Sequence, residues 1–233
     1  MERRSFFKNA LIATGSLLLG GATIHRFAIK KETMAERSLP PTIEKMTQQK
    51  NKKNILVLMS SRTRHGNTDQ LTDAYIRGVK EQGHSITKVY LGSMRLEGCR
   101  GCGVCQRNFH RCVIQDGMQE LYPLFAECDT LVMASPLYFW TITARLKSFI
   151  ERLYAISTED KYPSKDLVLL MTSGDDRETT FEHPLRYYKL ISDVFGGNGK
   201  GTYFAGGCTG CEDVARKIDK QHLDNAYKMG LEL

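Results

Sequence analysis

The sequence predicts an α/β protein, a three-layer sandwich in which a five-stranded parallel sheet carries helices on both faces. Short apolar runs alternate five times with segments of helical periodicity, and this alternation is typical of a doubly wound sheet. Three of the runs end in polar turns rich in Ser, Thr, Gly or Asp. Because the carboxyl ends of parallel strands meet at one edge, these turns are expected to form a single ligand site there.

The first unit joins a buried strand to a turn suited to an anion. Residues 55–59 are all apolar, which indicates a strand buried on both faces. Residues 60–68 then read Ser-Ser-Arg-Thr-Arg-His-Gly-Asn-Thr and lead into an amphipathic helix. The amide groups and the dipole of a helix N-terminus favour an anion such as a phosphate. One face of this helix is expected to hold Leu71, Ala74, Tyr75, Gly78 and Val79.

The second unit is expected to lie nearer the sheet edge. Gly83 marks the end of the first helix, and residues 85–91 alternate in the manner of a strand. A loop rich in Gly and Cys follows over residues 98–112. Asp116 then predicts a helix N-cap, with Gln119 completing a capping box. The apolar face of that helix is expected to hold Met118, Leu121, Tyr122 and Phe125.

The last three strands are predicted at residues 130–134, 167–171 and 202–205. The first two end in the polar or aromatic loops 135–141 and 172–176. A helix is expected over about 182–195, where the pair Gly196-Gly197 would stop it. The helices after the third and fifth strands are expected to bury Leu146, Phe149, Ile150 and Leu153, and Val214, Ile218, Leu223 and Ala226, respectively.

The net charge of the chain is concentrated in its N-terminal part. Residues 1–53 carry 11 Lys or Arg and 4 Asp or Glu, whereas residues 54–233 carry 22 basic and 22 acidic side chains. The predicted folded part is therefore neutral overall, which gives no electrostatic support for a nucleic-acid partner. We divide the chain into a signal segment (1–28), a polar linker with little structure (29–53) and one domain (54–233).

The signal segment carries an export pattern. Residues 3–8 read Arg-Arg-Ser-Phe-Phe-Lys and precede an apolar stretch over residues 9–25. This resembles a twin-arginine signal. The resemblance implies transport by the twin-arginine export machinery, after cofactor uptake, to the periplasm or the outer face of the cytoplasmic membrane. No clean A-x-A cleavage site follows, so a retained membrane anchor at residues 9–25 stays an open alternative.

Residues 54–233 resemble the flavodoxin-like NADPH-dependent FMN reductase and iron–sulfur flavoprotein family. The resemblance rests on three stretches and their order: the S-x-x-x-x-G-N-T turn at 61–68, the cysteine loop leading into 113–119, and Ser-Pro-Leu-Tyr at 135–138 followed by 146–152. It implies a sheet of strand order 2-1-3-4-5 with FMN at its carboxyl edge.

The same resemblance implies which residues bind FMN. The turn after the first strand would hold the phosphate, and the aromatic loop after the third would line the isoalloxazine ring. The family often has Gly and Arg where this chain has Ser60 and Thr63, so Arg62 or Arg64 is expected to supply the charge. The expected cofactor-binding residues are Ser61, Arg62, Gly66, Asn67, Thr68, Pro136, Leu137, Tyr138, Phe139, Ser173 and Gly174.

Four cysteines form the second chemical feature. Their spacing is Cys99-x2-Cys102-x2-Cys105-x6-Cys112, with Gly101 and Gly103 between them. Four thiolates so close in sequence can bind a 4Fe-4S cluster, and the spacing resembles that of iron–sulfur flavoproteins. Zinc, disulfides or an inherited loop without any metal are the alternatives that the sequence leaves open.

The predicted function is an FMN-dependent oxidoreductase that moves electrons from NAD(P)H, a quinol or a protein donor to an acceptor such as a quinone. Because the flavin carries the chemistry, no separate catalytic side chain is expected. The alternative is a non-enzymatic electron carrier that holds FMN and a 4Fe-4S cluster. The resemblance also implies a homodimer or homotetramer.

Overall fold

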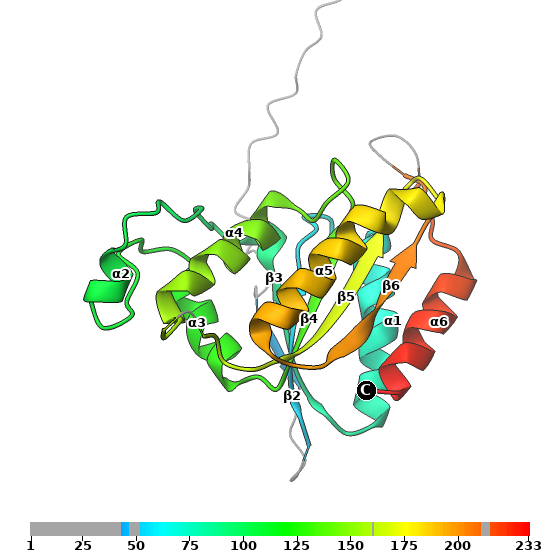
Figure 1. The fold of residues 1–233 in the computed structure, drawn as a ribbon. Helices are drawn as coiled ribbons and strands as arrows, with labels where there is room; N and C mark the ends of the chain where they lie inside the picture. The colour runs from blue at the N-terminus through cyan, green and yellow to red at the C-terminus, as the bar shows by residue number, and fades with distance from the viewer. Residues whose placement is uncertain (1–42, 47–51, 160, 211–214) are drawn as a thin grey trace, which may run out of the picture. The chain divides into compact units, whose positions relative to one another are not determined.

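A six-stranded sheet forms the middle layer in this computed structural model, which describes residues 43–46, 52–159, 161–210 and 215–233. The strand order is β1-β3-β2-β4-β5-β6, and the five strands from β2 to β6 are parallel (Figure 1). This confirms the predicted order 2-1-3-4-5. The parallel strands are β2 (Asn54–Met59), β3 (Ser85–Tyr90), β4 (Thr130–Pro136), β5 (Asp166–Thr172) and β6 (Gly199–Ala205).

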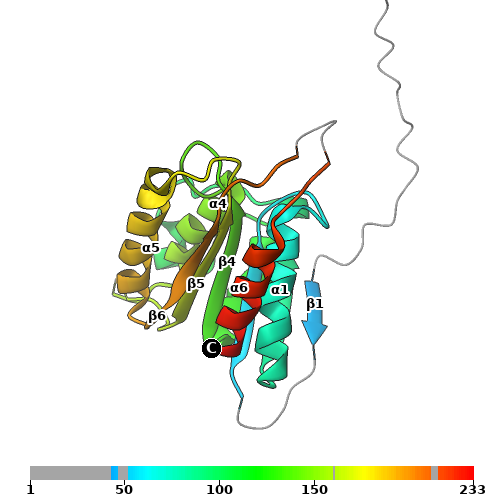
Figure 2. The same cartoon turned by 90° about the vertical axis from the view of Figure 1, so that its right-hand side faces the viewer.

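The sixth strand comes from the segment that we expected to be an unstructured linker. Strand β1 (Ile43–Met46) pairs antiparallel with β3, with Ile43 opposite Val89 and Met46 opposite Ile86 (Figure 2). The prediction for residues 29–53 is therefore wrong at residues 43–46. The pairing has a physical reason, because β3 would otherwise present unpaired N–H and C=O groups at the sheet edge.

Helices cover both faces of the sheet, as predicted. Alternate residues of each central strand point to opposite faces, so β2 places Ile55, Val57 and Met59 in one core and Leu56 and Leu58 in the other. The first core is closed by α1 (Asn67–Glu81) and α6 (Lys220–Leu231) (Figure 2). The second core is closed by α3 (Met118–Glu127), α4 (Ala144–Arg152) and α5 (Glu182–Phe195).

Three short helical segments follow strands or helices, and one more lies in the cysteine loop. They are η1 (Leu91–Ser93), η2 (Leu153–Ile156), η3 (Glu178–Phe181) and α2 (Val104–Arg107). Helix α5 ends where the sequence predicted, with Gly196 in the left-handed conformation (φ 59°) as its C-cap. No described helix has the length and apolar composition that a membrane span needs. The predicted signal segment, residues 1–28, lies outside the described residues.

Two predicted helix starts differ from the structure. Helix α6 begins at Lys220 because the Asp219 side chain accepts a hydrogen bond from the Gln221 amide (2.7 Å). Ile218 therefore precedes this helix, although it is buried, and Val214 lies outside the described residues. At α3, Asp116 accepts from the Met118 amide, but Gln119 does not complete a capping box. Its amide instead donates to the Ile114 carbonyl oxygen (2.7 Å).

A buried ion pair joins Asp116 to Arg152. Both carboxylate oxygens of Asp116 accept from the guanidinium, at 2.9 and 3.1 Å. The same guanidinium also donates to the carbonyl oxygens of Glu97 and Ile114, at 3.0 and 3.3 Å. Since these two residues flank the cysteine loop on either side, Arg152 fixes both ends of that loop to α4.

Candidate functional site

The loops after β2, β4, β5 and β6 surround one cavity of about 390 Å³ at the carboxyl edge of the sheet. It lies where parallel α/β sheets bind their ligands. Nine of the eleven predicted cofactor-binding residues line it: Ser61, Gly66, Asn67, Thr68, Pro136, Leu137, Tyr138, Ser173 and Gly174. Its remaining lining residues were not predicted: Thr63, Thr172, Cys208, Gly210 and Arg216.

The turn between β2 and α1 ends in a helix N-terminus that has no side-chain cap. Gly66 is the N-cap, and as a glycine it cannot fill the space in front of the first-turn amides. The turn is held by its own hydrogen bonds, from the Thr63 amide to Ser61 Oγ (3.2 Å) and from the Gly66 amide to the Thr63 carbonyl oxygen (3.3 Å). This end of α1 can therefore bind an anion supplied by a ligand.

A buried ion pair stabilises the turn. Asp69 Oδ2 accepts from the His65 amide (2.7 Å), and Asp69 Oδ1 accepts from Lys88 Nζ (2.7 Å). Burial alone would lower the pKa of Lys88, but its hydrogen bonds to Asp69 and Asp73 outweigh this and raise it. Lys88 is thus a permanent cation paired with Asp69 as well as with Asp73, and it lessens the repulsion between the buried Asp69 carboxylate and an anion at the helix start.

The Asn67 side chain has one buried polar atom without a hydrogen-bond partner among the described residues. Its Nδ2 donates to the Thr209 carbonyl oxygen (2.8 Å), which fixes the orientation of the amide. Its Oδ1 is buried and has no hydrogen-bond partner among the described residues. An unpaired buried acceptor costs roughly 1–3 kcal/mol, so a hydroxyl or N–H donor from a ligand would stabilise this position.

The structure places a different arginine at the cavity from the two that the sequence suggested. Arg62 is exposed and does not line the cavity. The Arg64 guanidinium stacks on the Tyr90 ring, 3.7 Å from its centroid. Arg216 lines the cavity together with Ser61 and Asn67, so it is the residue that brings positive charge to the lining.

Arg216 reaches the cavity through a backbone pairing that has no local sequence motif. Thr209 and Lys217 exchange two backbone hydrogen bonds, at 3.0 and 3.1 Å. Gly210 makes the close approach possible, since a Cβ there (φ 109°) would lie 2.4 Å from Arg216 Cα. Asn67 ties this pairing to α1 through Thr209. The only sequence signal is the glycine.

The aromatic loop after β4 is a tight turn with a strained backbone. Tyr138 and Thr141 exchange backbone hydrogen bonds at 3.0 and 3.1 Å, and the two residues between them, Phe139 and Trp140, have φ of 47° and 59°. Such turns favour Asn and Gly because bulky residues are strained at positive φ. Tyr138 lines the cavity, whereas Phe139 faces a neighbouring one.

Replacing Phe139 and Trp140 by Asn and Gly should therefore stabilise the fold. Relief of the two strained residues is expected to raise the free energy of unfolding by roughly 1–2 kcal/mol. Urea denaturation measures the change. The control is Val113→Asn. Val113 is an exposed apolar residue whose backbone φ is not positive, so its replacement should leave stability unchanged. A double variant less stable than the parent would show that the aromatic side chains stabilise the turn.

The cysteine loop has the donor types of a cluster site but not its geometry. All four cysteines are free thiols; Cys99 and Cys102 are exposed, and Cys105 is buried. Within the described residues, which include all four, no three side chains of His, Cys, Asp or Glu come close enough together to hold a metal ion. Gly101 and Gly103 have positive φ, so the loop contains two points where its path turns sharply.

The chain matches a known family and is similar to several known proteins. Residues 53–182 match the family model of NADPH-dependent FMN reductases. An iron–sulfur flavoprotein of Archaeoglobus fulgidus is 34% identical over 96 residues, which cover 41% of this chain and 43% of that protein. Another, from Methanocaldococcus jannaschii, is 23% identical over 180 residues, which cover 76% and 93% of the two chains.

The fold is also found among solved structures. The NAD(P)H:quinone oxidoreductase from Methanothermobacter marburgensis superposes with a TM-score of 0.60 at 18% identity, covering 78% of this chain and 96% of that one. The chain matches less than half the length of the first two iron–sulfur flavoproteins to which it is similar, 43% of one and 44% of the other. Because the family model matches more than half of the chain, this protein belongs to the NADPH-dependent FMN reductase family, a family of FMN-dependent oxidoreductases.

Proposed function

We propose that the cavity at the carboxyl edge of the sheet binds FMN and that the protein is an FMN-dependent oxidoreductase. The observation that carries this proposal is the combination of an uncapped helix N-terminus, Arg216 and the unpaired Asn67 Oδ1 around one cavity. The first two suit a phosphate, and the third suits a hydroxyl of the ribityl chain. Family membership supports the same cofactor.

The residues of the cavity have separate roles in this proposal. The α1 N-terminus and Arg216 hold the phosphate, while Asn67 orients the ribityl chain. Leu137 and Tyr138 give an apolar wall beside the isoalloxazine ring, and Ser173 offers a polar contact next to it. When bound, FMN supplies the electron-transfer chemistry, so the side chains need only bind the cofactor, orient it and leave one approach open for its reaction partners.

We further propose that the protein works outside the cytoplasm and takes its electrons from a quinol or a protein. The twin-arginine pattern at residues 3–8 supports export, and residues 9–25 would serve as an anchor if they are retained. Free NAD(P)H is a cytoplasmic donor. Anaerobic stopped-flow absorbance tests the choice: a reduced naphthoquinone should reduce the bound flavin faster than NADPH does. Fast reduction by NADPH and none by the quinol would contradict it.

A second candidate function is electron transfer through FMN and a 4Fe-4S cluster in one chain. The four cysteines and the similarity to iron–sulfur flavoproteins favour it. Iron and sulfide analysis of anaerobically purified protein separates the two functions. Four irons and four sulfides per chain would support the carrier, since that is the content of one such cluster. Flavin without iron would support the reductase alone.

A further inference from the structure

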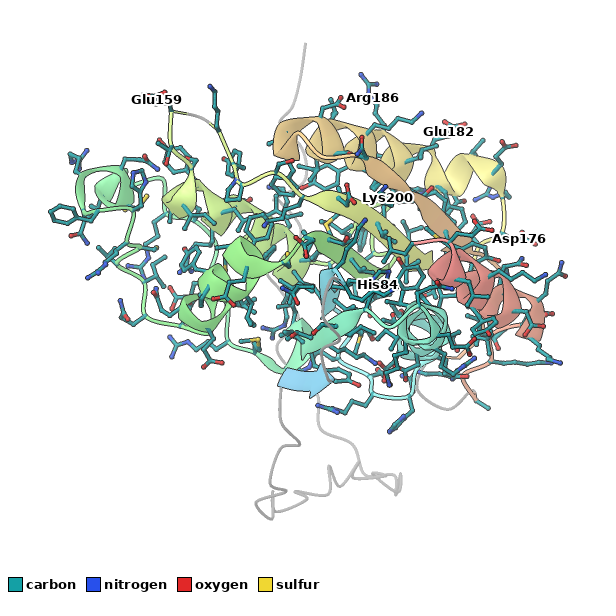
Figure 3. All side chains as sticks on the ribbon, turned by 90° about the horizontal axis from the view of Figure 1, so that it is seen from below. His84, Glu159, Asp176, Glu182, Arg186 and Lys200 are labelled. Atoms are coloured by element: carbon teal, nitrogen blue, oxygen red, sulfur yellow. The ribbon has the colours of Figure 1, made fainter. Side chains whose placement is uncertain are left out.

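The end of the cysteine loop projects from the fold. Helix α2 and the turn that follows it lie at the end of the molecule away from α6, and two views agree on this (Figure 1 and Figure 3). We refer to residues 107–111, Arg-Asn-Phe-His-Arg, as the tip. All five residues are exposed, and the Phe109 side chain is 89% exposed. The Phe109 ring therefore adds almost nothing to either hydrophobic core.

The backbone of the tip is fixed by its own hydrogen bonds. The amides of Asn108 and His110 both donate to the Cys105 carbonyl oxygen, at 3.2 and 3.0 Å. The Arg111 amide donates to the Asn108 carbonyl oxygen (2.9 Å). Phe109 and His110 have φ of 49° and 59°, a strained conformation for residues with side chains. Strain of this kind clusters at binding sites, where the direction of a side chain matters more than local stability.

The region around the tip is basic, although the domain as a whole is neutral. Residues 95–115 carry four arginines and a single carboxylate, that of Glu97. Glu97 pairs with Arg95 and Arg100, at 3.0 and 2.8 Å. Within the part of the chain that the structure describes, the other two arginines, which are those of the tip, form no ion pair and are exposed. Their charges are therefore available to an anionic surface.

Two more exposed apolar side chains adjoin the tip. Val113 follows it in the sequence, and Tyr154 lies in η2. Tyr154 is next to α2, since the Gln106 side-chain amide donates to its carbonyl oxygen (2.6 Å). One carboxylate, that of Glu159, lies at the same end of the fold and points away from α2 (Figure 3). This end of the molecule thus combines exposed aromatic rings with unpaired arginines.

We propose that the tip binds the surface of an anionic phospholipid bilayer, with Phe109 in the interfacial region and Arg107 and Arg111 at the headgroup phosphates. Interfacial aromatic rings and cations near anionic lipids are the two features that hold proteins at a bilayer surface. The inference goes beyond the proposed function, because it needs neither FMN nor a metal cluster.

The size and shape of the tip favour a bilayer over a protein partner. A stable protein interface takes about 20–30 residues from each side, whereas the tip has five. A projecting turn needs no complementary hollow in a bilayer, since the interfacial region is deformable and contacts the ring from all sides. The two arginines flank Phe109 in the sequence, so both can reach headgroups while the ring points toward the acyl chains.

A tryptophan at the tip reports on this contact alone. Trp140 is the only tryptophan in the chain, so Phe109→Trp combined with Trp140→Phe gives a full chain whose tryptophan emission comes from the tip. The protein is mixed, with a thiol reductant present, with vesicles of phosphatidylglycerol and phosphatidylcholine. Half of the samples carry bromine on the acyl chains. We expect a blue shift of the emission in all vesicles and quenching by the brominated ones.

The reporter distinguishes the tip from the basic N-terminal part of the chain, which can bring the protein to anionic vesicles by itself. Bromine on the acyl chains quenches only a ring that reaches them. Quenching by bound flavin is the same with and without bromine, so the comparison cancels it. Leu190→Trp with Trp140→Phe puts the reporter at an exposed apolar position of α5 and should show neither the shift nor the quenching.

The arginines are tested in the tip-reporter protein. Arg107→Gln with Arg111→Gln should raise the lipid concentration for half-maximal quenching at least roughly tenfold, and added salt should act in the same direction on the parent. Arg186→Gln with Lys189→Gln removes two exposed charges from α5 and is the matched control, with an expected change of about twofold or less. Equal values for the two double variants would overturn the role of the tip arginines.

Two further outcomes would overturn the proposal as a whole. One is a tip reporter that stays unquenched while the protein sediments with the vesicles. The other is a tip emission that shifts with poly-glutamate in the absence of vesicles and stays unquenched by bromine, which would favour an acidic protein partner. Urea denaturation should give the same midpoint for all these proteins, because every substituted side chain is exposed.

Discussion

Replacing Arg216 with glutamine should weaken FMN binding by roughly 10- to 100-fold and leave riboflavin binding unchanged. The two ligands differ only in the phosphate, so the comparison isolates the contact that Arg216 is proposed to make. A charge-assisted hydrogen bond contributes roughly 1.5–3 kcal/mol, and each 1.4 kcal/mol corresponds to about tenfold in Kd. Titration of the apoprotein with each flavin, followed by flavin fluorescence, measures both constants.

Arg62→Gln is the matched control for this experiment. It removes the same charge from an exposed position two residues from Arg64, in the turn itself, but outside the cavity lining. Its effect on the FMN Kd should stay within about twofold, as expected for a solvent-screened charge. If Arg62→Gln weakened FMN selectively and Arg216→Gln did not, the phosphate would be held from the turn and the assignment of Arg216 would be wrong.

Replacing Arg152 with methionine should lower the free energy of unfolding by roughly 3–5 kcal/mol. The variant keeps the bulk of the side chain but leaves the buried Asp116 carboxylate without its cation, and breaking a buried pair on one side has a cost of this size. The carbonyl oxygens of Glu97 and Ile114 also lose the hydrogen bonds from Arg152, and Ile114 keeps the one from Gln119. Urea denaturation at neutral pH measures the change.

The pH dependence of this loss follows from the ion pair. Burial alone would raise the pKa of Asp116, but its hydrogen bonds from Arg152 and from backbone amides outweigh this and lower the pKa below its ordinary range. A lowered pKa stabilises the folded chain at neutral pH, and the contribution is lost as the pH falls through the folded-state value. The difference between parent and variant should therefore shrink in acid.

Lys147→Met provides the comparison for Arg152. Lys147 lies on the same helix and pairs with Glu151 at 2.6 Å, but both side chains are substantially exposed. The loss of such a surface pair should change stability by less than about 0.5 kcal/mol. Similar losses in the two variants would mean that the burial of the Arg152 pair does not determine its strength.

The sheet could be predicted because its signals are local. Strands β2, β4 and β5 are apolar runs followed by polar turns, and α5 ends at a glycine that adopts the left-handed conformation. Strand β1 could not be predicted in the same way. Its four residues show no strong pattern, and they form a strand because β3 offers them an unpaired edge. Pairing between distant segments has no signature within either segment.

The candidate site likewise contains residues that the sequence predicts and residues that it does not. Turn residues such as Ser61 and Thr68 could be placed because they follow a strand, and all such turns converge at one sheet edge. Arg216 could not, because it reaches the cavity through the pairing of Thr209 with Lys217 and their link to Asn67. The ion pair of Asp116 could not be predicted for a similar reason. Arg152, 36 residues away, binds the Asp116 carboxylate from outside the local pattern.

The flavin content of the anaerobically purified full chain tests the central claim, an FMN-binding cavity, most directly. Absorbance gives the ratio of flavin to protein, and the mass of the flavin released on denaturation gives its identity. We expect close to one flavin per chain, released as FMN and not as riboflavin or FAD. A folded chain that carries no flavin, and whose addition leaves the fluorescence of free FMN unchanged, would contradict the account.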